Sequence, residues 1–318
     1  MAHRKVQVGG EPLSLDVCSL CMAVWFDESE LKPVFNRASV ARNGEQQDEQ
    51  LPLKARKQAA LMDMKTREEE QKRTVGETTG VPDEGWHWLP GLLGLPVETK
   101  APAVDDRPWG TWCMGAACVV LTVLLAGLVG LQEAAEALGF IPARWHRYGG
   151  LTILTSFSLH GGLMHMLGNI YFLYIFGDNM EDRLGTPMFI GVVAAGHAVG
   201  LLAQAVGSPH PMVPTIGASA GISSVVAFYG IMFPRAQLSF MFWFFFRPHW
   251  VHMSAPVALV LYIGFQLLGL YFQLSGFGGV AYLGHLGGLA VGAGVALWCW
   301  QVERRRRTAE WREVSKTT

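Results

Sequence analysis

Charged residues are scarce in this chain of 318 residues, and the scarcity is confined to one region. Asp, Glu, Lys and Arg make up 16% of the sequence, whereas an ordinary soluble domain has about 25%. Residues 1–108 carry 32 of these charges and residues 302–318 carry 9, so 10 of the 51 remain for residues 109–301. A middle segment with so few charges lacks a soluble surface, which excludes a purely soluble enzyme and a disordered protein.

Cysteine, net charge and an N-terminal apolar run are also lacking. The five cysteines form no evenly spaced framework, which excludes a secreted disulfide scaffold. The net charge is −1, so no basic field favours nucleic acid as a partner. The first ten residues contain no apolar run of the kind that a cleavable signal peptide needs. We therefore expect the N-terminal region to stay in the cytoplasm.

The composition predicts four zones along the chain. Apolar stretches dominate the third zone, and prolines and charges dominate the second. The zones are a small folded unit at 1–35, a linker at 36–108, a membrane domain at 109–301 and a basic tail at 302–318. The linker is charged and contains prolines, one possible helix and loop-like segments such as 94–106.

The third zone predicts an all-α membrane protein. A spanning helix needs about 20 mostly apolar residues. Six segments satisfy this requirement approximately: Trp112–Leu131, His160–Phe176, Met188–Val206, Ile216–Phe233, Ala255–Leu274 and Val280–Gln301. The apolar run Leu238–Phe246 is too short to span, and we expect it to be an interfacial segment beside the bundle.

The distribution of Lys and Arg predicts the orientation of the spans. The cluster Arg304–Arg307 follows the last span and is expected on the cytoplasmic side. An even number of spans then places the N-terminus on the same side, in a cell (inner) membrane. Arg144 and Arg147, in the long external first loop, are exceptions to this rule.

Three clusters of polar residues interrupt the spans, and polar groups inside a membrane are candidates for function. Each cluster falls in the first turns of a span that starts on the external side, so the three are expected at similar depth. They are His160, His165 and Asn169 in the second span, GASAG around Ser219 in the fourth, and GHLGG containing His285 in the sixth.

Each cluster has a purely structural alternative. GASAG is also a small-residue helix contact, His285 could hydrogen-bond a neighbouring helix, and His165 with Asn169 could hold helices together. Together, however, the three clusters match one chemistry. A neutral imidazole can remove the proton of a serine, and Asn and His can donate to an oxyanion. Gly287, Gly288 and Gly292 would let the sixth span approach the small face of the fourth closely, within reach of the serine.

These motifs resemble the rhomboid family of intramembrane serine proteases over roughly residues 109–301. The resemblance rests on four motifs in the family's order: LHGGLMHMLGN at 159–169, GDNMEDRLG at 177–185, GASAG at 217–221 and GHLGGLAVG at 284–292. It implies a bundle of six transmembrane helices and a Ser–His dyad without a triad aspartate. Inactive relatives typically lack the Ser or the His, and this chain has both.

The resemblance also assigns a role to each residue. It implies Ser219 as the nucleophile, His285 as the general base, and His165 and Asn169 as oxyanion side chains beside the Ser219 amide. No cofactor is required for such catalysis. Structural roles near the site are implied for His160, Gly217, Gly221 and Gly288, and for Glu181 and Arg183 in a cytoplasmic loop.

Two departures from the family pattern concern the base and the first loop. Some members place an aromatic ring four residues after the nucleophile, stacked on the base. Ser223 occupies that position here, which predicts a base that is held less tightly. The Trp-Arg pair that is frequent in the family's first loop is also not evident before His160.

The N-terminus resembles the second half of a small zinc ribbon. Cys18 and Cys21 form a CxxC pair that is followed by WFDESEL at 25–31. Such ribbons bind zinc with two Cys pairs, and the first pair is absent here. Zinc at Cys18 and Cys21 is therefore a weak expectation.

The sequence as a whole predicts an endopeptidase that cleaves transmembrane segments of membrane proteins in the lipid bilayer. Helix five and the loop Gln273–Gly279 are expected to form the substrate access path and its lid. The main alternative is a non-catalytic membrane scaffold or chaperone on the same fold. A transporter is disfavoured because the polar groups cluster on one side rather than at the midplane.

Overall fold

The computed structural model describes residues 2–8, 11–17, 24–25, 87–245, 247–277 and 279–316. The chain divides into two units, Met1–Glu70 and Gln71–Thr318. In the first unit, strands β1 (Ala2–Val8), β2 (Glu11–Val17) and β3 (Val24–Trp25) form an antiparallel sheet in that order. Cys18 and Cys21 lie outside the described residues, so the expected zinc site stays a prediction.

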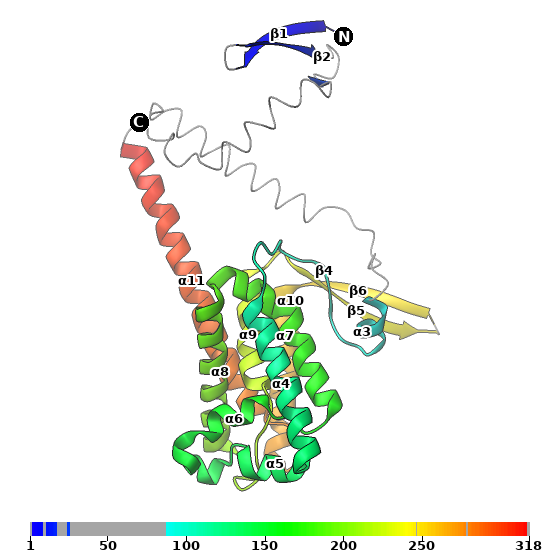
Figure 1. The fold of residues 1–318 in the computed structure, drawn as a ribbon, viewed down its shortest axis with the longest axis vertical. Coiled ribbons are helices and arrows are strands. Elements are labelled where there is room, and N and C mark those ends of the chain that lie inside the picture. The colour runs from blue at the N-terminus through cyan, green and yellow to red at the C-terminus, as the bar shows by residue number, and fades with distance from the viewer. Residues whose placement is uncertain are drawn as a thin grey trace. The chain divides into compact units, whose positions relative to one another are not determined.

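The second unit is mostly helical (Figure 1). Its long helices are α4 (Trp109–Leu128), α7 (Leu163–Leu184), α8 (Thr186–Gly207), α9 (Ser219–Met232), α10 (Ala255–Leu274) and α11 (Tyr282–Lys316). The shorter helices are α3 (Trp88–Leu92), α5 (Leu131–Leu138), η4 (Pro142–Arg144), η5 (Arg147–Gly150) and α6 (Thr152–Ser158).

Four helices among the described residues are long and apolar enough to cross a membrane: α4, α8, α10 and the part of α11 up to Arg306. Helix α9 is apolar but has 14 residues, about 21 Å. Helix α7 has 22 residues, but Asp178, Glu181 and Asp182 lie in its last turns and make it more polar. The predicted six spans thus correspond to six helices, of which four satisfy length and hydropathy together, and the count of six spans stays a prediction.

Several predicted boundaries are wrong. His160 was expected inside the second span, but Gly161 and Gly162 precede the start of α7 at Leu163, so His160 lies in the loop before it. Helix α7 continues to Leu184, eight residues past the predicted end at Phe176. Helix α11 continues without a break into the predicted basic tail.

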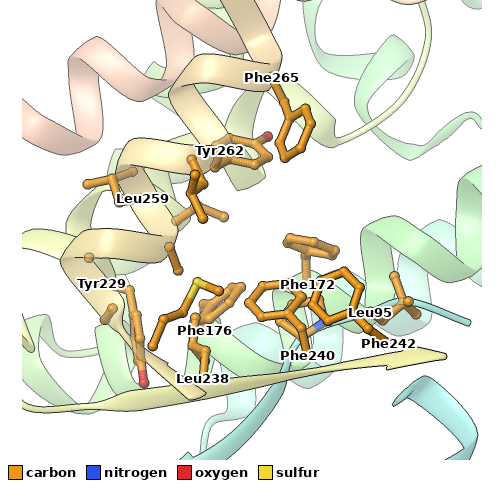
Figure 2. Close-up of a pocket in the computed structure, with 18 residues that line it drawn as sticks. Leu95, Phe172, Phe176, Tyr229, Leu238, Phe240, Phe242, Leu259, Tyr262 and Phe265 are labelled. Atoms are coloured by element: carbon orange, nitrogen blue, oxygen red, sulfur yellow. The ribbon is translucent and has the colours of Figure 1, made fainter. Parts of the chain in front are cut away.

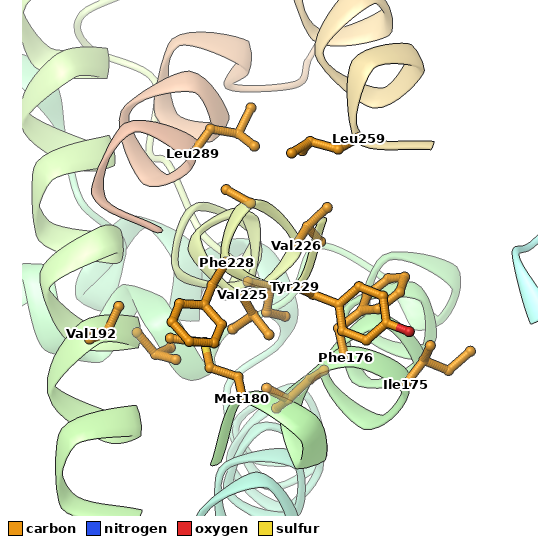
Figure 3. Close-up of a cluster of buried hydrophobic side chains, with 14 of the residues drawn as sticks. Ile175, Phe176, Met180, Val192, Val225, Val226, Phe228, Tyr229, Leu259 and Leu289 are labelled. Atoms are coloured by element: carbon orange, nitrogen blue, oxygen red, sulfur yellow. The ribbon is translucent and has the colours of Figure 1, made fainter. Parts of the chain in front are cut away.

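Helix α9 forms the centre of the bundle. Its residues from Ala220 to Gly230 are all buried, because the helix is apolar on every side and packs against α7, α8, α10 and α11. Figure 3 shows Val225, Phe228 and Tyr229 of α9 among side chains from the surrounding helices, including Phe176 and Met180. The residue that begins α9, Ser219, is therefore held by the best-packed element of the unit.

A second antiparallel sheet lies beside the bundle in this unit (Figure 1). Strands β4 (Val97–Lys100), β5 (Gln237–Phe244) and β6 (Arg247–Ser254) pair in that order. The predicted interfacial segment 238–246 is therefore mostly the strand β5, and the segment 94–106, expected to be a loop, contains β4. Strand β5 is rich in aromatic residues, which favour extended structure.

The long connection between α4 and α7 folds over the ends of the helices. The guanidinium of Arg147 donates to the carbonyl oxygens of Glu136 and Gly139, at 2.7 and 2.8 Å, at the C-terminal end of α5. A cation at that end of a helix also interacts favourably with the helix dipole. Arg147 was an exception to the predicted charge distribution, and this contact gives it a structural reason.

Candidate active site

Ser219 is the first residue of α9 and follows a glycine with unusual backbone geometry. Gly217 is buried and has a φ of +116°, which favours glycine over other residues. A Cβ on Gly217 would come within 2.8 Å of Cε1 and Nε2 of His165. The Gly217 amide donates to the carbonyl of Ser156 at 2.9 Å, which fixes the turn. Ser219 therefore begins α9 directly after a tight turn that packs against His165.

His285 lies in the first turn of α11, and its ring reaches the serine. Its Nε2 atom is 2.9 Å from Oγ of Ser219, which is hydrogen-bond distance. Both side chains are half-buried, so neither is sealed inside the protein. The structure thus brings together two residues that are 66 positions apart.

Glycines make this approach of α11 to α9 possible. A Cβ on Gly288 would overlap the carbonyl oxygen of Ala220, and one on Gly292 would overlap that of Ser224. The neighbouring Gly287 faces α8 instead, where a Cβ would lie 2.8 Å from the Cα of Gly200. Gly221 faces α8 as well, 2.8 Å from the carbonyl oxygen of Val193 by the same measure. The predicted close approach to α9 is confirmed for Gly288 and Gly292 and is wrong for Gly287, which faces α8.

The other ring nitrogen of His285 also has a partner. Its Nδ1 atom is 2.8 Å from Oε1 of Gln266, a residue of α10 that is 7% exposed. The ring of Tyr282 contacts the imidazole edge to face, at 6.0 Å between centroids. The expectation of a loosely held base, drawn from Ser223, is therefore wrong. Sequence reasoning missed Gln266, and its signal was a polar residue inside an apolar helix.

Ser223 has a different set of contacts. Its hydroxyl donates to the carbonyl of Ser219 at 2.8 Å and lies 3.1 Å from the hydroxyl of Tyr262 on α10. These bonds tie the first turn of α9 to α10 without a contact to the base.

His165 and Asn169 lie one turn apart on α7, as predicted. The ring of His165 lies against Gly217, two residues before Ser219. Asn169 is 8% exposed, and its amide nitrogen donates to the carbonyl of His165 at 2.9 Å. A carboxamide has two N–H groups, so one remains for another acceptor.

The helix end itself adds donors at the same place. The first N–H groups of an α-helix have no acceptor inside the helix, and the dipole makes this end positive. The N-cap residue of α9 is Ala218, whose methyl group cannot accept a hydrogen bond. The amide of Ser219, the first residue of α9, is therefore among the donors that have no acceptor inside the helix.

His160, Glu181 and Arg183 have structural contacts. His160 is 1% exposed, and its Nδ1 lies 3.4 Å from Oγ1 of Thr122. Glu181 accepts from the amides of Gly110 and Thr111, at 2.7 and 2.8 Å, and so caps α4. Arg183 pairs with Glu303 of α11. Glu181 and Arg183 were expected in a loop, but they lie in the last turns of α7.

An apolar cavity of about 340 Å³ lies away from Ser219 and His285 (Figure 2). Phe172 and Phe176 of α7 border it on one side and Tyr262 and Phe265 of α10 on another, with strand β5 as its floor. Tyr229 of α9 also lines it, ten residues after Ser219, which is about 15 Å along the helix. The cavity thus separates part of α7 from α10.

Metal coordination finds no support among the residues with described positions: they contain no group of three or more His, Cys, Asp or Glu that could hold an ion. The cysteines described are free: Cys113, Cys118 and Cys299.

Comparison with known proteins identifies the family of the chain. The rhomboid domain matches residues 143–302, half of the chain, so the protein belongs to the rhomboid family. The chain is also 30% identical over 148 residues to inactive rhomboid protein 1 of Drosophila melanogaster. That match covers 46% of this chain and 9% of the length of the relative. Family membership and the apolar helices together make this a multi-pass membrane protein.

Proposed function

We propose that the protein is an intramembrane serine endopeptidase that cleaves transmembrane segments of other membrane proteins. The observation that carries this proposal is the distance of 2.9 Å between Oγ of Ser219 and Nε2 of His285. A nucleophile within hydrogen-bond reach of an oriented base is the signature of covalent catalysis.

The geometry supports the following reaction. The hydroxyl of Ser219 gives its proton to His285 as its oxygen attacks the peptide carbonyl carbon, which forms a tetrahedral intermediate. The amide of Ser219, the ring of His165 and the second N–H of Asn169 are the donors proposed for its oxyanion. The imidazolium then protonates the leaving amine, and the peptide bond breaks. Water then gives a proton to His285 and attacks the acyl carbon. His285 returns the proton to Oγ of Ser219 as the acyl–oxygen bond breaks, which releases the second product.

Substrate access is proposed between α7 and α10, with the segment after α10 as a lid. The cavity between these helices means that they are not fully packed against each other. In the segment 275–281, Gly276 has a φ of +84° and Phe277 is 68% exposed. The predicted lid Gln273–Gly279 needs one correction, because Gln273 belongs to α10 and is 5% exposed.

The test of catalysis uses a fluorophosphonate probe and a fluorogenic transmembrane peptide on purified protein in lipid nanodiscs. Wild type is expected to be labelled and to cleave, and Ser219→Ala to do neither. Ser223→Ala is the matched control, because it removes a hydroxyl one turn further along the same helix. Cleavage by folded Ser219→Ala would refute the mechanism.

A non-catalytic scaffold is the second candidate, and the relative's name favours it. Inactive rhomboid protein 1 is described as inactive, and it is 30% identical over the matched region. A scaffold would bind membrane proteins with Ser219→Ala as well as with wild type, and would turn over no peptide. Labelling of wild type without turnover of any tested transmembrane peptide would favour this role.

We propose that the protein lies in the inner membrane of the cell with both termini in the cytoplasm. Ser208, at the end of α8, would then lie on the outside. A cysteine at Ser208, in a chain whose five native cysteines are replaced by serine, should react with an impermeant thiol reagent added to intact cells. Reaction of a cysteine at Thr318 instead would reverse the orientation.

A further inference from the structure

Helix α10 has two buried glutamines on a face that is otherwise apolar. Gln266 is 7% exposed and Gln273 is 5% exposed. They are seven residues apart, so they lie on one side of the helix, two turns from each other. Gly269 lies on the same side, where a Cβ would overlap the ring of Tyr282. Polar groups buried in a membrane helix are costly, so each glutamine needs a reason.

The contact of Gln266 decides which nitrogen of His285 carries the proton. An amide oxygen accepts hydrogen bonds and has no proton to donate. With Oε1 of Gln266 assigned to face the ring at 2.8 Å, Nδ1 of His285 acts as the N–H donor. In a neutral imidazole the other nitrogen, Nε2, then has a free lone pair. That lone pair faces Oγ of Ser219 at 2.9 Å, where it can accept the hydroxyl proton.

The opposite tautomer would be useless as a base. With the proton on Nε2, His285 would donate to Ser219 and could not accept from it. Without Gln266 the imidazole could adopt either tautomer, and its ring could turn about the bond to Cβ. Aspartate prevents both in a Ser-His-Asp triad because it can only accept, and an amide that presents its N–H to the ring reverses the tautomer and is strongly inactivating. An amide supports the base only when its oxygen faces the ring.

We propose that Gln266 is a positioning residue for His285: its side-chain carbonyl holds the imidazole in the tautomer and orientation that let Nε2 act as base toward Ser219. The effect on catalysis rests on the proposed protease function, whereas the effect on the tautomer does not. A neutral carbonyl provides the acceptor of a triad carboxylate without placing a charge inside the bilayer, which would be expensive.

Gln273 provides the contrast that a test needs. Its Nε2 donates to Oε1 of Gln204 on α8 at 3.2 Å, and its Oε1 accepts from the amide of Tyr282 at 2.8 Å. It therefore ties α10 to α8 and to the start of α11, and both of its hydrogen bonds go to partners other than His285. A residue that only holds helices together should behave like Gln273.

The experiment compares Gln266→Met and Gln273→Met. Methionine keeps the length and flexibility of glutamine and removes the acceptor. The tautomer of His285 is measured by ¹⁵N NMR on histidine-labelled protein in nanodiscs, and a His285→Ala spectrum identifies its signals. Wild type and Gln273→Met should show the proton on Nδ1, and Gln266→Met should show a mixture. Cleavage kinetics are measured on the same samples.

The expected kinetic result is a loss of about 10–100-fold in kcat for Gln266→Met, the size found when the hydrogen-bond partner of a metal-ligating histidine is removed. KM should change little, and Gln266→Glu should recover activity above Gln266→Met because it restores an acceptor. If Gln266→Met keeps the proton on Nδ1 and matches Gln273→Met in kcat, the proposal is wrong. If wild type cleaves nothing, the protease function fails, while the NMR comparison still decides the role of Gln266.

Discussion

Helix α11 contacts α9 and α10 in two different ways. Against α9 it packs backbone to backbone, since Gly288 and Gly292 leave no room for a side chain. Against α10 the contact is made by side chains: the His285 ring donates to Oε1 of Gln266, and the Tyr282 amide donates to Oε1 of Gln273. Next to α10 there is also an apolar cavity, whereas α9 is buried from Ala220 to Gly230.

The difference shows which part of the bundle can separate. Packing of glycine faces has one close-fitting arrangement, so the α9–α11 interface holds the two dyad residues at a fixed distance. Hydrogen bonds between side chains can be broken one at a time, so part of α10 can separate from the bundle while the bond of Gln266 to His285 is kept. In the proposed enzyme the reacting pair is on the fixed interface and the substrate path is beside the separable one.

Breaking the dyad that spans the fixed interface has the largest expected effect. Ser219→Ala and His285→Ala should each lower kcat by about 10⁴-fold or more, since removing a nucleophile or its base removes the covalent path. Both variants should remain folded, because each removes atoms from a half-buried position. The measurement is cleavage of a transmembrane peptide together with thermal unfolding. Residual cleavage within tenfold of wild type would move the chemistry to another residue.

A smaller effect is expected for Asn169 on α7, outside the fixed interface. Loss of one oxyanion donor costs about 10²–10³ in kcat, whereas loss of one hydrogen bond between membrane helices costs about 0.6 kcal/mol of stability. Asn169→Ala should therefore lower kcat strongly and shift the melting temperature little, and the fluorophosphonate should still label Ser219, more slowly. His165→Ala should act in the same direction but more mildly.

The opposite pattern would identify Asn169 as a packing residue. In that case kcat would stay close to wild type and the protein would melt at a clearly lower temperature. Its hydrogen bond to the carbonyl of His165 lies within α7, and loss of that bond would account for the lower melting temperature.

A third test widens the fixed interface itself. Gly288→Ala places a methyl group on the carbonyl of Ala220, whereas Gly294→Ala meets no atom within 4 Å. Extra atoms in a packed interior cost about 1–3 kcal/mol, and a displacement of about 1 Å at a reacting pair can cost 10²-fold in rate. Gly288→Ala should lose both stability and kcat, and Gly294→Ala should lose neither. Equal behaviour of the two variants would contradict the packing argument.

The smallest effect concerns the cavity side, where the hydroxyl of Tyr229 donates to Glu98 of β4. Burial raises the pKa of Glu98 from 4.5 to about 8. Between these values the unfolded chain releases a proton that the folded chain keeps, so stability contributed here falls as pH rises from about 4.5 to 8. Glu98→Gln should remove this slope, measured as the change in melting temperature between pH 5 and pH 8.5. A slope identical to that of wild type would mean that Glu98 is ionised in the fold.

Hydropathy and motif order predicted the helical bundle, but not the sheet beside it. The apolar segments locate six helices because a helix in lipid must be long and uncharged. Strand β5 has no alternating pattern, since residues 240–244 are apolar on both faces, and its partner β4 lies about 140 residues earlier. Pairing over that distance leaves no local mark in the sequence. The predicted end of α7 was wrong because the last turns of this helix contain charged residues that have partners. Glu181 caps α4 and Arg183 pairs with Glu303 of α11.

The pairing of Ser219 with His285 was predictable from the sequence, and the contact of Gln266 with His285 was not. Ser219, His285 and His165 each stand in the first turn of a helix, a placement that can be read from where the apolar segments begin. Gln266 stands in the middle of α10, and its meaning depends on the rotation of that helix about its axis. Ser223 gave a misleading signal, because it predicted a missing contact to the base that another helix provides.

The length of α11 has a consequence for where the reaction takes place. Arg304 follows His285 by 19 residues (304 − 285) on one unbroken helix, a rise of about 28 Å. The hydrocarbon layer of a bilayer is about 30 Å thick. If Arg304 and the arginines after it hold that end of α11 in one layer of headgroups, the imidazole of His285 lies close to the opposite layer. The depth of hydrolysis is then set by counting residues along a single helix, and a deletion of one turn between Trp298 and Arg304 would draw the base toward the dry centre of the membrane.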